Sequence, residues 1–228
     1  MTRFYSSSIG RKLMMALTGF FLMIFLLVHL SANLTLFAGN TDSNGNLLVK
    51  EEVLFNQASH FMATNPLIQV MQYVLALGFI YHIFLGITLT LKNQKARGKE
   101  RYAVNQLSTN TPFSSRTMIY TGILILVFLI IHLYNYFYPI KAGIAEDDYL
   151  LVTELFKNPI YTLIYVVSFI LLGLHLSHGF ASSFQSAGFN HRIYTPVIKI
   201  LGKVYFIFIA VGFAAIAIYF YFKGNGLI

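Results

Sequence analysis

Two patterns that contain histidine each occur twice in the chain, always within a long apolar stretch. The first runs from Asn-Pro through fifteen residues to a histidine, with a glycine four residues later, at Asn65-Pro66…His82…Gly86 and Asn158-Pro159…His175…Gly179. The second runs from Thr-Gly through nine residues to His-Leu, at Thr18-Gly19…His29 and Thr121-Gly122…His132. An imidazole inside a membrane is costly unless it has a function there. Two matched pairs therefore predict two metal centres, each held from both sides.

The composition places these histidines in a membrane protein. The chain has 228 residues and 57% of them are hydrophobic, more than is usual for a soluble domain. A spanning helix needs about 20 mostly apolar residues. Five segments qualify, at about 13–38, 67–91, 117–139, 160–184 and 197–222. We therefore predict an all-α fold, a single integral membrane bundle of five transmembrane helices over residues 1–228. The first segment is interpreted as a span and not as a signal peptide, because it is long and contains His29.

The basic residues predict the orientation of the bundle. Twelve of the sixteen Lys and Arg residues lie on the N-terminal side of the predicted spans, and seven of the eight acidic residues lie on the other side. The positive-inside rule then places the N-terminus in the cytoplasm and, with five spans, the C-terminus outside. The net charge of +8 follows from this topology, and no nucleic-acid partner is expected.

The depth of each histidine in its span predicts which ones pair. With a rise of about 1.5 Å per residue, His29 and His132 lie roughly 25 Å from the cytoplasmic boundary, near the outer face. His82 and His175 each follow a proline by sixteen residues on an inward-running span, and so lie near the cytoplasmic face. The sequence thus predicts an outer pair, His29 with His132, and an inner pair, His82 with His175.

Two opposed imidazoles at one depth suit the axial positions of a haem iron. The chain has no cysteine, and a non-covalently held haem needs none. Zinc or non-haem iron usually needs three or four converging ligands, and no predicted span carries a carboxylate. Because a porphyrin is a flat plate, we expect small residues on the ligand faces and predict this packing role for Gly78, Gly86 and Gly179. A hydrogen bond between helices is the alternative role for any single histidine.

His178 is a further histidine in the fourth apolar segment, three residues after His175. Only His175 has both the proline spacing and the following glycine, so His175 is the expected ligand. The short His-Leu-Ser-His motif is superficially similar to the histidine boxes of membrane di-iron enzymes. Those enzymes need several boxes near one face, and His178 has no comparable partners in the sequence.

Taken together, these residues resemble the cytochrome b subunit of succinate:quinone oxidoreductases and fumarate reductases, in the single-subunit form with five helices and two haems. The resemblance covers nearly the whole chain and depends on four histidines in order. The matching segments are Leu27-Val28-His29-Leu30, Phe55 to Met62, Ile80 to Gly86, Ile131-His132-Leu133 and Leu174 to Gly179.

The resemblance implies two haem b groups, with iron bound by His82 and His175 nearer the cytoplasm and by His29 and His132 nearer the outside. It also implies a flavoprotein and an iron–sulfur subunit on the cytoplasmic face of a bacterial inner membrane, with the dicarboxylate chemistry on the flavoprotein. This chain would be the anchor subunit of that enzyme and would pass electrons between the iron–sulfur subunit and membrane quinone, with menaquinone as the expected species.

Two other functions are alternatives. A two-haem cytochrome b of a hydrogenase or formate dehydrogenase has the same chemistry, but should differ in the order and spacing of its histidines. A histidine-containing metal transporter belongs to another class and would be expected to show polar or acidic residues along a pathway, or broken helices.

Polar residues near the predicted haems are candidates for two further roles. Quinone is expected near the outer haem, with His60, Asn33, Tyr134 and Asn135 as candidates. His60 is the best of them because an imidazole exchanges protons near neutral pH. A quinone site on the cytoplasmic side, near His82, is the competing location. Arg11 and Arg116 are candidates for contacts with haem propionates, since an interfacial carboxylate attracts a cation, and topology is their alternative role.

Overall fold

The computed structural model describes residues 7–97 and 117–228, which are helical apart from turns and one isolated bridge between Thr41 and Leu47. In these ranges five helices are long and apolar enough to cross a membrane, which confirms the predicted all-α class and agrees with the predicted five spans. They are α2 (Ser8–Leu34), α4 (Pro66–Arg97), α7 (Met118–His132), α10 (Pro159–Ser186) and α11 (Tyr194–Gly224). A 3-10 turn (Thr35–Ala38) extends α2, and a π-helical turn (Leu133–Phe137) and α8 (Tyr138–Lys141) extend α7.

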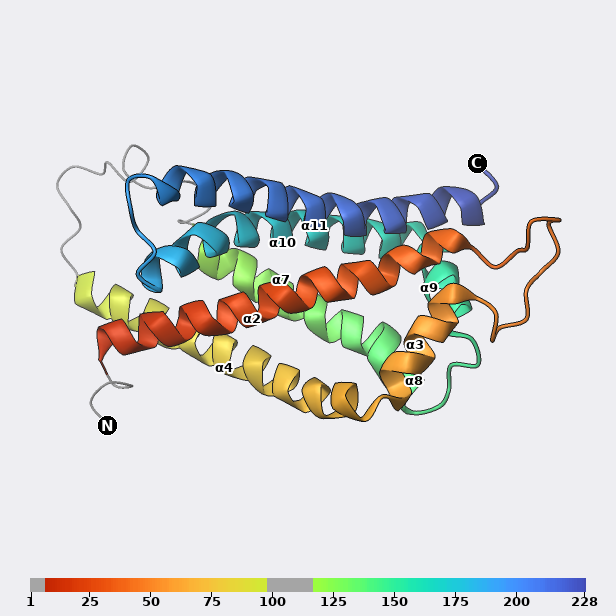
Figure 1. Cartoon of the computed structure of the whole chain (residues 1–228), viewed down its shortest axis with the longest axis horizontal. Coiled ribbons are helices and arrows are strands. Elements are labelled where there is room, and N and C mark those ends of the chain that lie inside the picture. Colours follow the sequence, from red (N-terminus) through yellow and green to blue (C-terminus); the bar gives the residue numbers. More distant parts are fainter. Residues whose placement is uncertain (1–6, 98–116) are drawn as a thin grey trace.

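Helix α2 begins at one end of the bundle, and α11 ends at the opposite end (Figure 1). We refer to the end where α2 begins as the N-terminal end. The opposite end carries two short helices, α3 (Leu54–Thr64) and α9 (Asp148–Lys157), and is referred to as the loop end. Helix α10 packs against α2, α7 and α11, and α4 packs mainly against α2. Outward-facing residues such as Leu77, Ile130 and Leu163 are exposed, as a lipid-facing surface requires.

Helices α4 and α10 begin in the same way, at the two Asn-Pro pairs. Asn65 Oδ1 accepts hydrogen bonds from the backbone N–H groups two and three residues ahead, at 3.0 and 3.2 Å. Asn158 Oδ1 accepts from the same two positions, at 2.9 and 3.4 Å. Each proline follows at a position where a missing N–H is harmless. The two helices therefore start at the same distance from His82 and His175.

Replacing Asn158 by Ala should lower the free energy of unfolding by about 1 kcal/mol, because two N–H groups at the start of α10 lose their acceptor. Unfolding of the purified protein in detergent, followed by circular dichroism, measures this. Asn158→Ser keeps an acceptor and should behave nearly as the unchanged protein. Equal stability of the Ala and Ser variants would mean that this cap does not stabilise the helix.

The loop end is fastened by hydrogen bonds between α3 and the start of α9. Asn56 Nδ2 donates to the backbone carbonyl of Lys50 at 2.9 Å and to Asp147 Oδ1 at 3.1 Å, and Asn56 Oδ1 accepts from the N–H of Tyr149 at 2.8 Å. The hydroxyl of Ser59 donates to the carboxylate of Asp148. These contacts hold the first and third connections together at one end of the bundle.

The two short helices lie in the connections at the loop end. The apolar spacing from Leu47 to Met62 allows a short surface helix, and in the structure α3 begins there only at Leu54. Helix α9 begins where Glu146-Asp147-Asp148 has the composition of a loop. In the structure Asp147 instead caps α9 and accepts a hydrogen bond from the N–H of Leu150 at 2.9 Å.

Helix α11 contains no histidine but closes one side of the bundle. A Cβ on Gly212 would lie 2.8 Å from Leu30 Cδ2, so only glycine lets α11 approach α2 this closely. Leu30 is fully buried at this contact. The adjacent residue Phe213 lies beside His29, with ring centroids 5.6 Å apart. The fifth helix thus forms part of the wall around one histidine pair.

Candidate functional site

The four histidines that the sequence paired by depth lie together in those two pairs. The rings of His29 on α2 and His132 on α7 have centroids 5.8 Å apart and planes at 88°. The rings of His82 on α4 and His175 on α10 have centroids 6.5 Å apart and planes at 66°. Each pair joins two long helices across the bundle.

These separations suit two imidazoles on opposite sides of one metal ion. A bond of about 2.0–2.1 Å from metal to histidine nitrogen, with the ring centroid about 1 Å further back, gives a centroid separation of roughly 6 Å. Both observed values are close to this. The two pairs lie at different heights in the bundle. Thr18 contacts the inner pair, and His29 of the outer pair lies eleven residues further along α2, or about 16 Å of helix.

Thr18 on α2 holds the ring of His82 on α4. Its Oγ1 lies 3.1 Å from Nδ1 of His82, and 3.0 Å from the backbone carbonyl oxygen of Met15. A hydroxyl has one proton to donate, and the carbonyl can only accept it. Thr18 therefore accepts the hydrogen bond from Nδ1–H of His82. With its proton on Nδ1, His82 has a free lone pair on Nε2 for a metal.

Thr121 on α7 makes the same contact with His175 on α10. Its Oγ1 lies 3.3 Å from Nδ1 of His175 and donates to the backbone carbonyl of Met118 at 3.0 Å. The side chain of Thr121 is buried, so water does not compete for these bonds. Both histidines of the inner pair are thus fixed in the tautomer that leaves Nε2 free.

Two glycines lie beside these rings. A Cβ on Gly122 would lie 3.6 Å from Cε1 of His175, an ordinary contact. A Cβ on Gly19 would lie 3.8 Å from Cε1 of His82 and 3.1 Å from Oγ of Ser183. Both glycines follow the threonines that hold the same histidines. Each Thr-Gly dipeptide therefore lies against a histidine of the neighbouring helix, with a hydroxyl at one ring atom and a glycine beside another.

The glycines predicted to face the haem have other neighbours in the structure. A Cβ on Gly78 would lie 2.9 Å from Phe21, one on Gly86 3.5 Å from Met15, and one on Gly179 3.8 Å from Met118. Gly78 thus allows α4 to approach Phe21 of α2 closely, whereas a Cβ at Gly86 or Gly179 would make an ordinary contact. Their role in haem packing stays a prediction, whereas Gly19 and Gly122 lie beside the imidazoles themselves.

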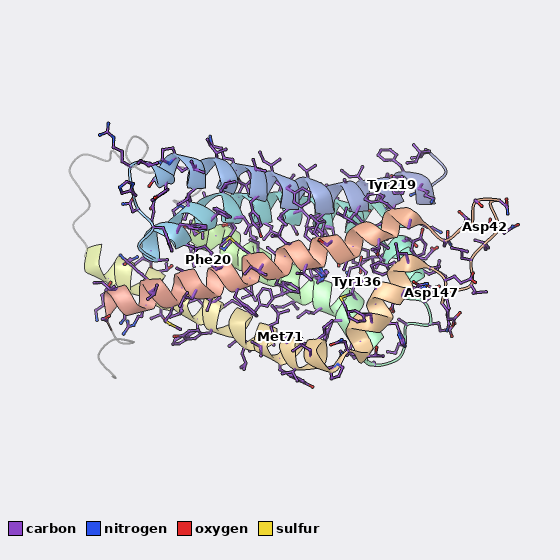
Figure 2. All side chains as sticks on the ribbon, in the orientation of Figure 1. Phe20, Asp42, Met71, Tyr136, Asp147 and Tyr219 are labelled. Atoms are coloured by element: carbon purple, nitrogen blue, oxygen red, sulfur yellow. The ribbon has the colours of Figure 1, made fainter. Side chains whose placement is uncertain are left out.

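The outer pair has aromatic neighbours in place of hydroxyls. Phe25 stacks on His29 with ring centroids 5.2 Å apart, and Tyr136 lies edge-on to His132 at 5.2 Å. Figure 2 shows Tyr136 among the helices, away from Asp42 and Asp147 at the loop end. Nδ1 of His132 is buried and has no hydrogen-bond partner among residues 7–97 and 117–228. The two pairs therefore differ in their polar support.

The four predicted quinone residues do not form one cluster among the described side chains. Asn33 Nδ2 donates to the backbone carbonyl of His29 at 2.8 Å, and Asn135 Nδ2 donates to the hydroxyl of Tyr165 at 3.1 Å. Tyr134 is 72% exposed and stacks on Tyr138, and His60 is exposed on α3. Of this set, Asn33 bonds to the backbone of His29 one turn earlier in α2, and Asn135 forms a polar cluster with Tyr165.

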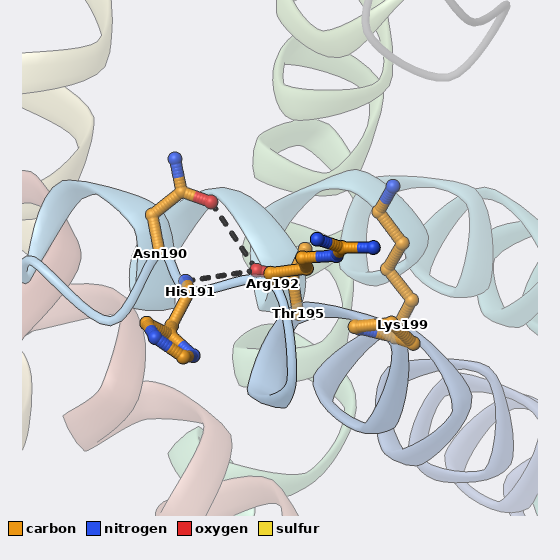
Figure 3. A pocket seen from close by; sticks show the side chains of 6 residues that line it. Asn190, His191, Arg192, Thr195 and Lys199 are labelled. Atoms are coloured by element: carbon orange, nitrogen blue, oxygen red, sulfur yellow. Dashed lines mark hydrogen bonds between the residues drawn. The ribbon is translucent and has the colours of Figure 1, made fainter.

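The N-terminal end of the bundle carries basic side chains. The turn between α10 and α11 surrounds a pocket of about 580 Å³ whose lining includes His191, Arg192 and Lys199 (Figure 3). Thr195 orders the turn by donating to Asn190 Oδ1 and accepting from the N–H of His191, both at 3.2 Å. Arg11, predicted as a propionate contact, lies in the first turns of α2 at the same end, and Arg116 lies outside the described residues.

The donor set and the surroundings fit haem. Each centre offers two imidazoles, and the described residues contain no group of three or more His, Cys, Asp or Glu that could hold another metal. Beside the inner pair, an apolar groove of about 700 Å³ between α2 and α4 has Thr18 and Gly78 in its wall. Searches against protein-family models, curated proteins and solved structures find no match.

Sequence reasoning missed the link between the two repeated patterns. The Thr-Gly dipeptides were recognised only as markers that precede His29 and His132 in the chain. In the structure they contact the other pair of histidines, His82 and His175. The repetition itself was the signal in the sequence, since a threonine at the same place in two matched apolar helices can be the hydrogen-bond partner of a polar ring.

Proposed function

We propose that this chain is the membrane-anchor cytochrome b subunit of a succinate:quinone oxidoreductase or fumarate reductase. The observation that carries the proposal is the pairing of four histidines at two heights, each pair bridging two long helices at about the spacing of two ligands on one metal. His82 and His175 hold the iron of one haem b, and His29 and His132 hold that of the other. Each haem, when bound, takes up and releases one electron at a time.

The inner pair supports this proposal most strongly. Thr18 and Thr121 orient the rings of His82 and His175 and keep their protons on Nδ1, and a glycine lies beside Cε1 of each ring. At the outer pair Phe25, Phe213 and Tyr136 exclude water around the imidazoles. A histidine that only joined two helices by a hydrogen bond would not need an imidazole facing it.

In this proposal the N-terminal end faces the cytoplasm of a bacterium and the C-terminus lies outside. The basic pocket formed by His191, Arg192 and Lys199 then lies at the surface that receives the iron–sulfur subunit, which carries the flavoprotein. Quinone, expected to be menaquinone, reacts near the outer pair, where Asn33 and the cluster of Asn135 and Tyr165 supply polar groups inside the bundle.

The proposal is tested by counting haem. The chain, purified from membranes, should show a reduced-minus-oxidised spectrum of b-type haem, and pyridine haemochrome analysis should give two haems per chain. Absence of haem in protein made with ample haem supply would contradict the proposal. The proteins that co-purify with the chain distinguish the proposed function from related ones. A flavoprotein with succinate dehydrogenase activity would support this assignment. A hydrogenase or formate dehydrogenase subunit would instead identify the chain as the two-haem cytochrome of that enzyme.

A further inference from the structure

We propose that Thr18 and Thr121 tune the inner haem, because each accepts the Nδ1–H of one of its two ligands. This inference rests on the proposed function, since it assigns a role to the residues behind the ligands. Thr18 and Thr121 are positioning residues: they act through His82 and His175 and do not touch the metal themselves.

The direction of each hydrogen bond follows from what surrounds the hydroxyl. Thr18 Oγ1 has the carbonyls of Met14 and Met15 at 3.1 and 3.0 Å, and Thr121 Oγ1 has that of Met118 at 3.0 Å. A proton shared with these carbonyls is not available to the imidazole, so the hydroxyl must accept at its other side. Because each hydroxyl accepts, it favours the tautomer with the proton on Nδ1. In the other tautomer the proton is on Nε2, and that nitrogen cannot bind iron.

This arrangement changes the electron density on the ligand atom. An imidazole that donates Nδ1–H becomes more basic at Nε2, and a more basic ligand favours the oxidised metal over the reduced one. The inner pair has this support on both ligands. At the outer pair, Nδ1 of His132 is buried with no such partner in the described part of the chain. The hydroxyls therefore lower the reduction potential of the inner centre selectively.

A threonine that only bonds to its own helix is the simpler explanation, because Thr commonly bonds to a carbonyl three or four residues earlier in a helix. That explanation does not require an imidazole nitrogen at the other side of the hydroxyl. Here the contact occurs twice, at the same position of two matched helices, and each threonine precedes a glycine that faces the same ring. The repetition favours a role at the metal centre.

The test uses the purified full-length protein with Thr18→Val and Thr121→Val, which keep the shape of the side chain and remove the hydroxyl. Thr18→Ser and Thr121→Ser keep the hydroxyl and are the matched controls. Thr162→Val is a second control, because Thr162 is buried and bonds to a carbonyl but lies thirteen residues before His175 on α10. Haem content, redox titration of the optical bands and the electron paramagnetic resonance signals of the oxidised haems are measured for each. The inner haem is the one that His82→Ala removes.

In each Val variant, reduction of the inner haem should be favoured about tenfold more than in the unchanged protein. For one electron this equals a rise in the reduction potential of about 59 mV. The reduction potential of the outer haem should not change. Loss of the inner haem alone in the Val variants, restored in the Ser variants, supports the same role. Unchanged potentials in the Val variants, or equal shifts of the potential in the Ser or Thr162→Val proteins, would overturn the inference. Two haems per chain would in that case still uphold the proposed function. Loss of both haems in Val and Ser variants alike would also overturn it.

Discussion

Alanine at any one of the four paired histidines should remove or convert one haem and leave the other in place. The reason is that each pair is isolated: among the described residues no third His, Cys, Asp or Glu joins either pair to supply a substitute ligand. The chain should then contain about one normal haem instead of two by pyridine haemochrome analysis. The variants are His29→Ala, His82→Ala, His132→Ala and His175→Ala.

Double variants test the pairing itself. Because His82 and His175 belong to one centre, replacing both should cost no more haem than replacing either one. Replacing His82 together with His29 should remove both haems. His178→Ala is the matched control, since His178 lies on the same helix as His175, and it should keep two haems. Loss of a haem in that control, with retention in His175→Ala, would contradict the ligand assignment.

A leucine at Gly122 should eliminate the inner haem and spare the outer one. The side chain would extend toward Cε1 of His175, where even a Cβ reaches 3.6 Å, so the ring must move away from its ligating position. Overfilling a packed interior costs about 1–3 kcal/mol, and here relief requires displacing the ligand. Optical spectra and haem quantitation should show about one haem per chain, with the properties of the outer centre.

Two controls separate this effect from general damage to the helix. Gly122→Ala adds only the Cβ, which makes an ordinary contact, and should keep both haems. Ile123→Leu places leucine at the next position, whose side chain is exposed on the outward face of α7, and should also keep both. Retention of two unchanged haems with leucine at Gly122 would show that the space beside His175 is not needed for binding.

The sequence alone determined the features that depend on position along a single helix. The five spans follow from the length of the apolar segments, and the starts of α4 and α10 follow from Asn65 and Asn158 capping their own chains. The pairing of the histidines also follows, because helical rise converts a residue count into depth and only side chains at equal depth can meet.

Only the tertiary structure decided which helix lies beside which, and with what rotation about its axis. Periodicity places Gly78 and Gly86 on the ligand's own helix face, but an imidazole extends away from its helix toward a neighbour. The residues beside the imidazole are therefore on that neighbour, as Gly19 and Gly122 are. The hydrogen bond from His82 to Thr18 likewise joins residues 64 positions apart. Such contacts arise from packing between helices, which local propensity and spacing along one helix do not encode.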